Sequence, residues 1–281
     1  MREKETLQAI LSAFRARLCA EEKSAATVEK YCHDAAALLR FLGGRKATRE
    51  RVIAWKQSLV DGGYAVASIN SMLAAGNAFL SFLGLDGLRV RAVKRQRRIY
   101  CPEERELTRA EYRRLLSAAQ RRGNERLCLL LQTLCATGIR VSELAFITVE
   151  AARRGEAAVR CKGKTRAVFL VKELQKRLAR YAARHGIVTG PVFITRTGKP
   201  MSRTNVWREM KGLCAEAGVD ARKVFPHNLR HLFARVFYGL EKDLARLADL
   251  LGHSSIETTR IYIISTGTEH RRFMEQMRLV I

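Results

Sequence analysis

Apolar residues in the first ninety positions recur at helical spacing and form four separate stripes. The stripes cover residues 7–18, 28–42, 52–59 and 69–82. Ser24 and Thr48 precede the second and third stripes as candidate N-caps, and the glycine pairs at 43–44 and 62–63 follow them. We therefore predict four short helices that pack as a small bundle.

The second half of the chain mixes helical and strand patterns. The Thr-x-x-Glu pattern at 108–111 predicts a capping box before an apolar-periodic helix. Residues 157–160 and 167–171 have strand patterns and flank a turn at 162–164, which predicts a hairpin, and residues 192–195 predict one more short strand. Helical patterns fill most of the remainder, so we expect a mainly α fold with a small antiparallel β-sheet.

The net charge of the chain indicates what kind of partner it binds. Lys and Arg number 52 against 27 Asp and Glu, which gives a formal net charge of +25, and 38 of the 52 basic residues are Arg. So large an excess is typical of proteins that bind a polyanion, and the guanidinium fork matches phosphate oxygens. We predict a nucleic-acid partner; the alternative is that the charge serves solubility.

A run of cations separates the two halves. Six of the ten residues from 89 to 98 are basic: Arg89, Arg91, Lys94, Arg95, Arg97 and Arg98. Such a run cannot form a core and favours a linker that lies against phosphates. The predicted limits are 1–88 for the helical domain, 89–106 for the basic linker and 107–281 for the second domain.

The cysteines and the apolar runs predict a cytoplasmic protein with no part in a membrane. Seven cysteines are scattered and never spaced as C-x-x-C, which argues against a disulfide framework and against a zinc ribbon. The first residues lack the apolar core of a signal peptide, and no apolar run is long enough to cross a bilayer.

Three segments of the second domain contain cationic side chains, and the last of them also contains a tyrosine. The segments are residues 138–144, 226–231 and 250–262. In the first, Glu143 lies one turn beyond Arg140 and is placed to orient it. Taken alone, each segment has a simpler interpretation: a surface ion pair, a capping histidine, or a tyrosine in the core. Together and in order within a basic domain, they favour a catalytic site.

The spacing within the other two segments predicts shared helix faces. Residues 227 and 230 stand at i and i+3, so both point from one face. Ser254 and Glu257 predict another capping box, which would place His253 at a helix N-terminus and Tyr262 two turns beyond. The histidines lack metal-ligand spacing, so we expect no metal site.

This ordered set resembles the tyrosine recombinase (phage integrase) family over nearly the whole chain. Residues 136–144 resemble the family's first arginine box and 227–231 its second, while 251–253 with Tyr262 resemble its nucleophile segment. Residues 161–166 resemble the hairpin that carries its catalytic lysine. The resemblance implies a SAM-like core-binding domain followed by a catalytic domain, the two closing as a C-shaped clamp on DNA. With no further arm-binding domain ahead of the bundle, the chain resembles Xer- or Cre-like members.

The resemblance implies six catalytic residues: Arg140, Lys162, His227, Arg230, His253 and Tyr262. In this chemistry the Tyr262 hydroxyl attacks a DNA phosphodiester, and both arginines with His253 hold the non-bridging oxygens. His227 takes the phenol proton and Lys162 protonates the departing 5′-oxygen, with Lys164 as its rival. The 3′-phosphotyrosine stores the bond energy, so no metal, ATP or other cofactor is expected.

Other residues would support this chemistry. Glu143 and His231 would orient catalytic groups. The expected DNA contacts are Arg91, Lys94, Arg95, Arg97 and Arg98 on the linker, and Lys164 and Arg166 on the hairpin.

The implied partners are double-stranded DNA with inverted-repeat core sites and further copies of the chain. The resemblance implies a homotetramer on two DNA sites, a monomer or weak oligomer when free, and a bacterial, nucleoid-associated protein. The tail after Tyr262 would dock on a neighbouring protomer, or fold back in cis. Mobile-element integration or excision and DNA inversion are favoured over chromosome-dimer resolution. The alternatives are a type IB topoisomerase-like strand transferase and a non-catalytic DNA-binding accessory protein.

Overall fold

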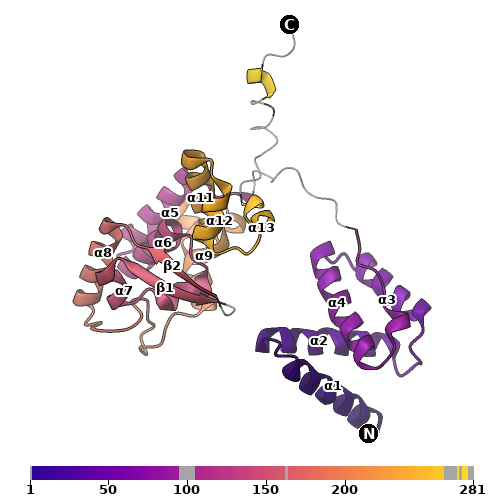
Figure 1. Ribbon diagram of the computed structural model, residues 1–281. Coiled ribbons are helices and arrows are strands. Elements are labelled where there is room, and N and C mark those ends of the chain that lie inside the picture. The colour runs from indigo at the N-terminus through magenta and orange to yellow at the C-terminus, as the bar shows by residue number, and fades with distance from the viewer. Residues whose placement is uncertain (1, 95–104, 162–163, 263–270, 272–273, 278–281) are drawn as a thin grey trace. The chain divides into compact units, whose positions relative to one another are not determined.

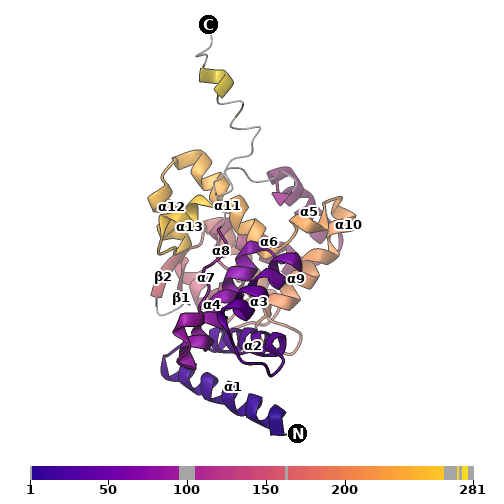
Figure 2. The same ribbon diagram turned by 90° about the vertical axis from the view of Figure 1, so that its right-hand side faces the viewer.

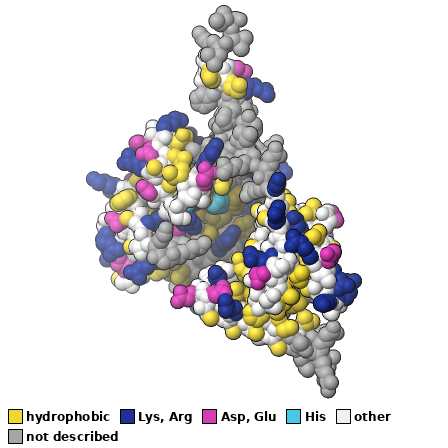
Figure 3. All heavy atoms as spheres, turned by 45° about the vertical axis from the view of Figure 1, so that its right-hand side comes forward, with side chains coloured by type: hydrophobic (Ala, Val, Ile, Leu, Met, Phe, Trp, Pro, Cys, Tyr) yellow, Lys and Arg dark blue, Asp and Glu magenta, His cyan; other side chains and the backbone are white. Residues whose placement is uncertain are grey.

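The computed structural model describes residues 2–94, 105–161, 164–262, 271 and 274–277 (Figure 1). The chain divides into two compact units, Met1–Arg97 and Arg98–Ile281. Each unit has its own hydrophobic core and is described separately. Lys and Arg side chains lie at many places on the visible face of each unit (Figure 3).

The N-terminal unit is the predicted four-helix bundle. Its elements are α1 (Arg2–Ala20), α2 (Ala25–Leu42), α3 (Arg49–Asp61), α4 (Val66–Phe82) and the short 3₁₀ turn η1 (Asp86–Leu88). Both predicted caps are confirmed, because the Ser24 and Thr48 hydroxyls accept hydrogen bonds from backbone N–H groups three residues on. A Cβ at Gly76 would lie 2.8 Å from the Trp55 ring, so glycine lets α4 approach α3 closely.

The start of the basic run packs on α4. The Asn77 side chain donates to the Val90 carbonyl at 2.8 Å and accepts from its N–H at 3.0 Å. Asn70 makes the same pair of bonds with Val93, at 3.0 and 2.7 Å. Val90 is 8% exposed and belongs to the core of this unit. Residues 89–94 are therefore held in an extended conformation along α4.

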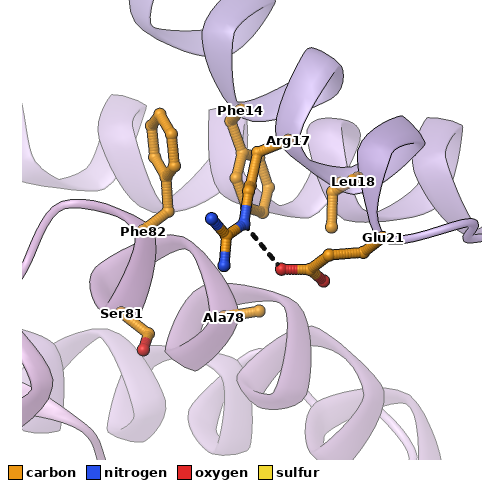
Figure 4. A pocket seen from close by; sticks show the side chains of 7 residues that line it. All are labelled: Phe14, Arg17, Leu18, Glu21, Ala78, Ser81 and Phe82. Atoms are coloured by element: carbon orange, nitrogen blue, oxygen red, sulfur yellow. Dashed lines mark hydrogen bonds and ion pairs between the residues drawn. The ribbon is translucent and has the colours of Figure 1, made fainter.

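A small hollow lies between α1 and α4 (Figure 4). Its walls are Phe14, Leu18, Phe82, Ala78 and Ser81, with Arg17 and Glu21 beside them. The Arg17 Nε donates to the Glu21 carboxylate at 2.8 Å across one helical turn. The hollow is thus lined by both apolar and polar side chains, including an ion pair, and all of them belong to the N-terminal unit.

The C-terminal unit is built from helices around one β-hairpin. Its elements are α5 (Arg109–Arg121), α6 (Glu125–Thr137), η3 (Val141–Phe146), α7 (Val149–Arg154), β1 (Glu156–Cys161), β2 (Lys164–Phe169), α8 (Lys172–Arg184), α9 (Arg203–Gly212), α10 (Cys214–Ala217), η4 (Ala221–Lys223), α11 (Pro226–Glu241), α12 (Leu244–Leu251) and α13 (Ile256–Arg260). The predicted capping box at Thr108 and Glu111 is confirmed. Helix α6 runs through the core, with Leu130, Leu131 and Leu134 fully buried.

The predicted antiparallel hairpin is confirmed, although Lys164, which the sequence pattern placed in the turn, is the first residue of β2. Cys161 pairs with Lys164 and Val159 with Arg166, so β1 and β2 are joined directly through residues 162–163. The predicted strand at 192–195 is wrong: the structure has only isolated bridges there, Thr148 with Pro191 and Ile194 with Pro200. Prolines lack the N–H that a continued ladder needs, which explains why no strand grows from these bridges.

Candidate active site

The second and third predicted segments meet where α11, α12 and α13 pack together (Figures 1 and 2). Tyr262 follows α13 directly and is 6% exposed, in a small core cluster with Ala234, Leu247 and Leu251. Three histidine rings surround the Tyr262 ring: His231 at 4.3 Å between ring centroids, and His227 and His253 at 5.2 Å.

Arg230 is the buried cation of this cluster, with 1% of its surface exposed. Its Nη1 donates to the Gly138 carbonyl at 2.6 Å and its Nη2 to the Leu251 carbonyl at 2.7 Å. Among the described residues no carboxylate forms an ion pair with it, and its Nε has no hydrogen-bond partner. Burial lowers the pKa of Arg230 to about 10, so the guanidinium stays charged at neutral pH.

Gly138 brings the end of α6 to Arg230. It is the C-cap of α6 in the left-handed region, with φ at 62°. A Cβ there would lie 2.5 Å from the Phe233 ring of α11. Glycine is therefore required both for the backbone conformation and for the close approach of the two helices.

His253 lies beside Arg230 rather than in the predicted cap. Its Nε2 is 2.8 Å from Arg230 Nη2, and its Nδ1 is 2.8 Å from the hydroxyl of buried Thr259. Because a guanidinium only donates, Nε2 accepts and Nδ1 carries the proton. The predicted Ser254–Glu257 capping box is wrong: Ser255 takes the N-cap position of α13 and makes no side-chain cap bond. The backbone turn places Ser255, not its neighbour, in the extended cap conformation.

His227 is the hydrogen-bond partner of the nucleophile candidate. Its Nε2 lies 3.3 Å from the Tyr262 hydroxyl. Burial lowers the pKa of His227, and the charges of Arg230 and Arg140 lower it further. Burial also lowers the pKa values of His231 and His253 to about 4. These three rings are therefore neutral at pH 7.

Arg140 reaches the site from the turn after α6. It caps η3, and Glu143 accepts both its backbone N–H at 2.8 Å and its Nη1 at 3.0 Å. The Glu143 side chain is 2% exposed, whereas that of Arg140 is 36% exposed. Arg140 is close enough that its charge lowers the pKa of both Arg230 and His253. The first predicted segment thus joins the other two.

Arg166, one of the expected DNA contacts, lies beside Glu143. Its Nη2 donates to Glu143 at 2.6 Å, and its side chain is 14% exposed. The strand pattern carried this signal, because Val168 on β2 and Leu170 just after it are buried, and a period of two puts residue 166 on the same face.

The remaining predicted residues divide between the two units. Arg91 and Lys94 are exposed on the segment that packs on α4. Lys162, Arg95, Arg97 and Arg98 lie outside the described residues, and Lys164 is the first residue of β2.

Within the described part of the chain, no group of three His, Cys, Asp or Glu side chains is arranged to hold a metal ion. No described helix combines the length and apolarity needed to cross a membrane.

Solved structures with the same fold are recombinases. A crystal structure of XerA recombinase covers 98% of this chain and 99% of its own, with a TM-score of 0.55 and 25% identity. A XerH site-specific recombinase bound to its difH substrate covers 97% and 95%, with a TM-score of 0.70 and 17% identity. A lambda integrase tetramer bound to a Holliday junction covers 91% and 76%, with a TM-score of 0.73 and 20% identity.

Sequence comparisons cover both units of the chain. Residues 105–269 match the phage integrase family and residues 11–87 match the phage integrase N-terminal SAM-like domain. Tyrosine recombinase XerA of Pyrococcus furiosus is 30% identical, covering 100% of this chain and 98% of that protein. Tyrosine recombinase XerD of Brucella suis is 34% identical, covering 71% and 72%. With these matches across both units, the chain belongs to the phage integrase family and is a Xer-like tyrosine recombinase.

Proposed function

We propose that this protein is a site-specific DNA recombinase that cleaves and rejoins duplex DNA through a 3′-phosphotyrosine at Tyr262. The observation that carries the proposal is the Tyr262 hydroxyl, which lies 3.3 Å from a neutral His227, beside a buried arginine that no described carboxylate neutralises. A buried cation without an ion-paired carboxylate is costly, and a bound phosphate would supply a negative charge directly beside it.

Neutral His227 is suited to receive the phenol proton. Its pKa is lowered by burial and by neighbouring arginines, so its Nε2 lone pair is free to accept at pH 7. As the hydroxyl oxygen attacks phosphorus, its proton passes to Nε2 and the bond from phosphorus to the 5′-oxygen breaks. The proton that the 5′-oxygen needs would come from Lys162, with Lys164 as the alternative donor on the same hairpin.

Arg230 and Arg140 would stabilise the charge that builds on the non-bridging oxygens. Arg230 already points two of its nitrogens at fixed backbone carbonyls, so little reorganisation is needed when a phosphate arrives. His253 holds Arg230 through Nε2 and uses its N–H on Thr259. In this arrangement His253 orients the arginine rather than donating directly to the phosphate.

The phosphotyrosine conserves the energy of the broken bond, so rejoining requires neither ATP nor metal. We propose that the substrate is double-stranded DNA with inverted-repeat core sites, held between the core-binding domain, the linker at 89–106 and the catalytic domain as a C-shaped clamp. The similar fold of the lambda integrase tetramer on a Holliday junction supports a homotetramer that exchanges strands between two sites. The tail beyond Tyr262 would dock on the neighbouring protomer.

The proposed cellular role is integration or excision of a mobile element, or DNA inversion, at the nucleoid of a bacterium. This proposal rests on how common such roles are among integrase-family proteins. The sites at which the enzyme cuts would separate these roles from chromosome-dimer resolution.

The test is to recover covalent adducts. Purified wild-type protein and Tyr262→Phe are incubated with fragmented genomic DNA without ATP or divalent metal, and denaturant-stable adducts are sequenced. We expect adducts from the wild type alone, concentrated at an inverted-repeat site. Adducts without sequence preference would instead support a topoisomerase-like enzyme, and DNA binding without any adduct would support a non-catalytic accessory protein.

A further inference from the structure

Arg166 connects the hairpin to the buried carboxylate of the first arginine segment. The Glu143 carboxylate accepts from Arg140 Nη1 at 3.0 Å through one oxygen and from Arg166 Nη2 at 2.6 Å through the other. Glu143 is almost wholly buried, so its charge depends on these two cations for compensation. One carboxylate is thus shared by two arginines from different elements.

Because Glu143 is shared between Arg140 and Arg166, it compensates only part of the positive charge of Arg140. Arg140, Glu143 and Arg166 carry a net charge of +1 together, whereas Arg140 and Glu143 alone would carry none. Without Arg166, the carboxylate would turn fully to Arg140 and neutralise it. With Arg166 in place, Arg140 keeps a positive field toward its more exposed side.

Arg166 also lies against the segment that carries His253. A Cβ at Gly252 would lie 2.4 Å from Arg166 Nε and 2.5 Å from its Cδ. Gly252 has a φ of 66° and ends α12, one residue before His253. The charge of Arg166 contributes to the lowered pKa of His253, which is consistent with this closeness. A single side chain therefore contacts both the Arg140 segment, through Glu143, and the His253 segment, at Gly252.

We propose that Arg166 is a positioning residue for strand cleavage: it shares Glu143 with Arg140, so that Arg140 stays available to the phosphate, and it packs on Gly252 to hold the His253 segment. The inference rests on the proposed function. It assigns Arg166 to the inside of the catalytic unit, in place of the DNA contact expected from its sequence position.

The test compares Arg166→Met with Arg160→Met in the full-length protein. Arg160 lies on the same hairpin but is exposed, so it is the matched control for a surface cation. The probe is a nicked duplex built on the cleavage site that adduct sequencing recovers. It carries either a normal phosphodiester or a methylphosphonate at the cleaved position, since the methyl group removes one negative oxygen.

We expect Arg166→Met to bind the nicked duplex with unchanged affinity and unchanged salt dependence. Its single-turnover cleavage rate at saturating protein falls about tenfold, less than the hundredfold or more expected for loss of a direct donor. The deficit shrinks on the methylphosphonate, because that substrate needs less positive charge. Arg166→Lys, which keeps the charge, recovers part of the rate, and it replaces Arg166→Met if the latter does not fold.

Four results would overturn the inference. Weaker binding with a shallower salt dependence and a normal saturated rate, as expected for Arg160→Met, would make Arg166 a DNA contact. An equal loss on both substrates would make its role purely structural. If the wild type forms no adduct on any DNA, the proposed function fails and this inference fails with it; normal wild-type cleavage beside normal Arg166→Met cleavage contradicts the inference alone.

Discussion

The two arginine segments of the site hold their cations in opposite ways. Arg140 is partly exposed and bonds to a buried carboxylate. Arg230 is fully buried, and its hydrogen-bond partners include two carbonyl oxygens and a histidine nitrogen. One cation shares a buried carboxylate with Arg166, and the other has no carboxylate paired with it among the described residues, in a place where charge is costly.

The two arginines therefore contribute to the site in different ways. Glu143 and Arg166 hold Arg140 in position at little electrostatic cost. The carbonyls of Gly138 and Leu251 fix Arg230 without cancelling it, so its full charge faces the Tyr262 ring, whose centroid lies 5.8 Å away. The segment around Arg230 is therefore prepared for an anion before one binds.

The largest expected effect is on cleavage rate. Arg230→Ala should slow single-turnover cleavage by about a hundredfold or more, because it removes a fixed donor to the transition state. Arg140→Ala should slow it less, since Arg140 is the less rigidly held of the two. Arg246→Ala, an exposed cation on α12, serves as the control. If Arg230→Ala cleaves as fast as Arg246→Ala, Arg230 is structural.

The free energy of unfolding should depend more on Glu143, the partner of Arg140, than on Arg230. Glu143→Leu leaves Arg166 and Arg140 without their carboxylate and should lower the free energy of unfolding of the catalytic unit by about 3 kcal/mol. Arg230→Met leaves no charge unpaired and should lower it less. Chemical denaturation of both variants measures the difference. A larger loss for Arg230→Met would mean that Arg230 stabilises the fold more than the carboxylate does.

The histidines around Tyr262 predict a pH dependence. The pKa values of His231 and His253 are about 4 in the folded protein, against an ordinary value of 6.5. Between these values the unfolded chain binds more protons, so stability is constant above about pH 6.5 and falls as the pH drops toward 4. Melting temperatures across this range should vary less in His231→Asn than in wild type. His185→Asn, on the exposed C-cap of α8, should follow the wild-type curve; an unchanged slope in His231→Asn would contradict the assignment.

The smallest expected effect is on the salt dependence of DNA binding, and it concerns two cations outside the site. Arg91 and Lys94 are exposed on the segment held by Asn77 and Asn70. If both contact phosphates, the double alanine variant should flatten the slope of log affinity against log salt by up to about 1.8. Arg184→Ala, which removes a cation paired with Glu125, is the control. An unchanged slope would show that these cations do not contact DNA.

Local sequence signals predicted local structure well. The caps at Ser24, Thr48 and Thr108 and the antiparallel hairpin depend on neighbours within a few residues, and all are confirmed. The capping box at Ser254 failed because the fold makes the adjacent Ser255 the N-cap of α13, so that Glu257 no longer stands at the third helical position. The strand at 192–195 failed because pairing depends on distant partners, which here are prolines.

The residues of the site could be predicted from the sequence, but their arrangement in space could not. Residues 227 and 230 share a helix, so their common face follows from spacing. The approach of Tyr262 to His227 spans 35 positions and depends on how α11 to α13 pack. The inward turn of Arg166 was readable from the alternation on β2, although its cationic side chain favoured a surface position.

The most direct measurement is to identify both ends of the covalent bond. Adduct formed by wild-type protein on the nicked duplex is digested with protease and nuclease, and the remaining peptide–nucleotide is analysed by mass spectrometry. The account predicts a nucleotide joined through its 3′-phosphate to the peptide that contains Tyr262. Attachment to another residue, or through a 5′-phosphate, would contradict it.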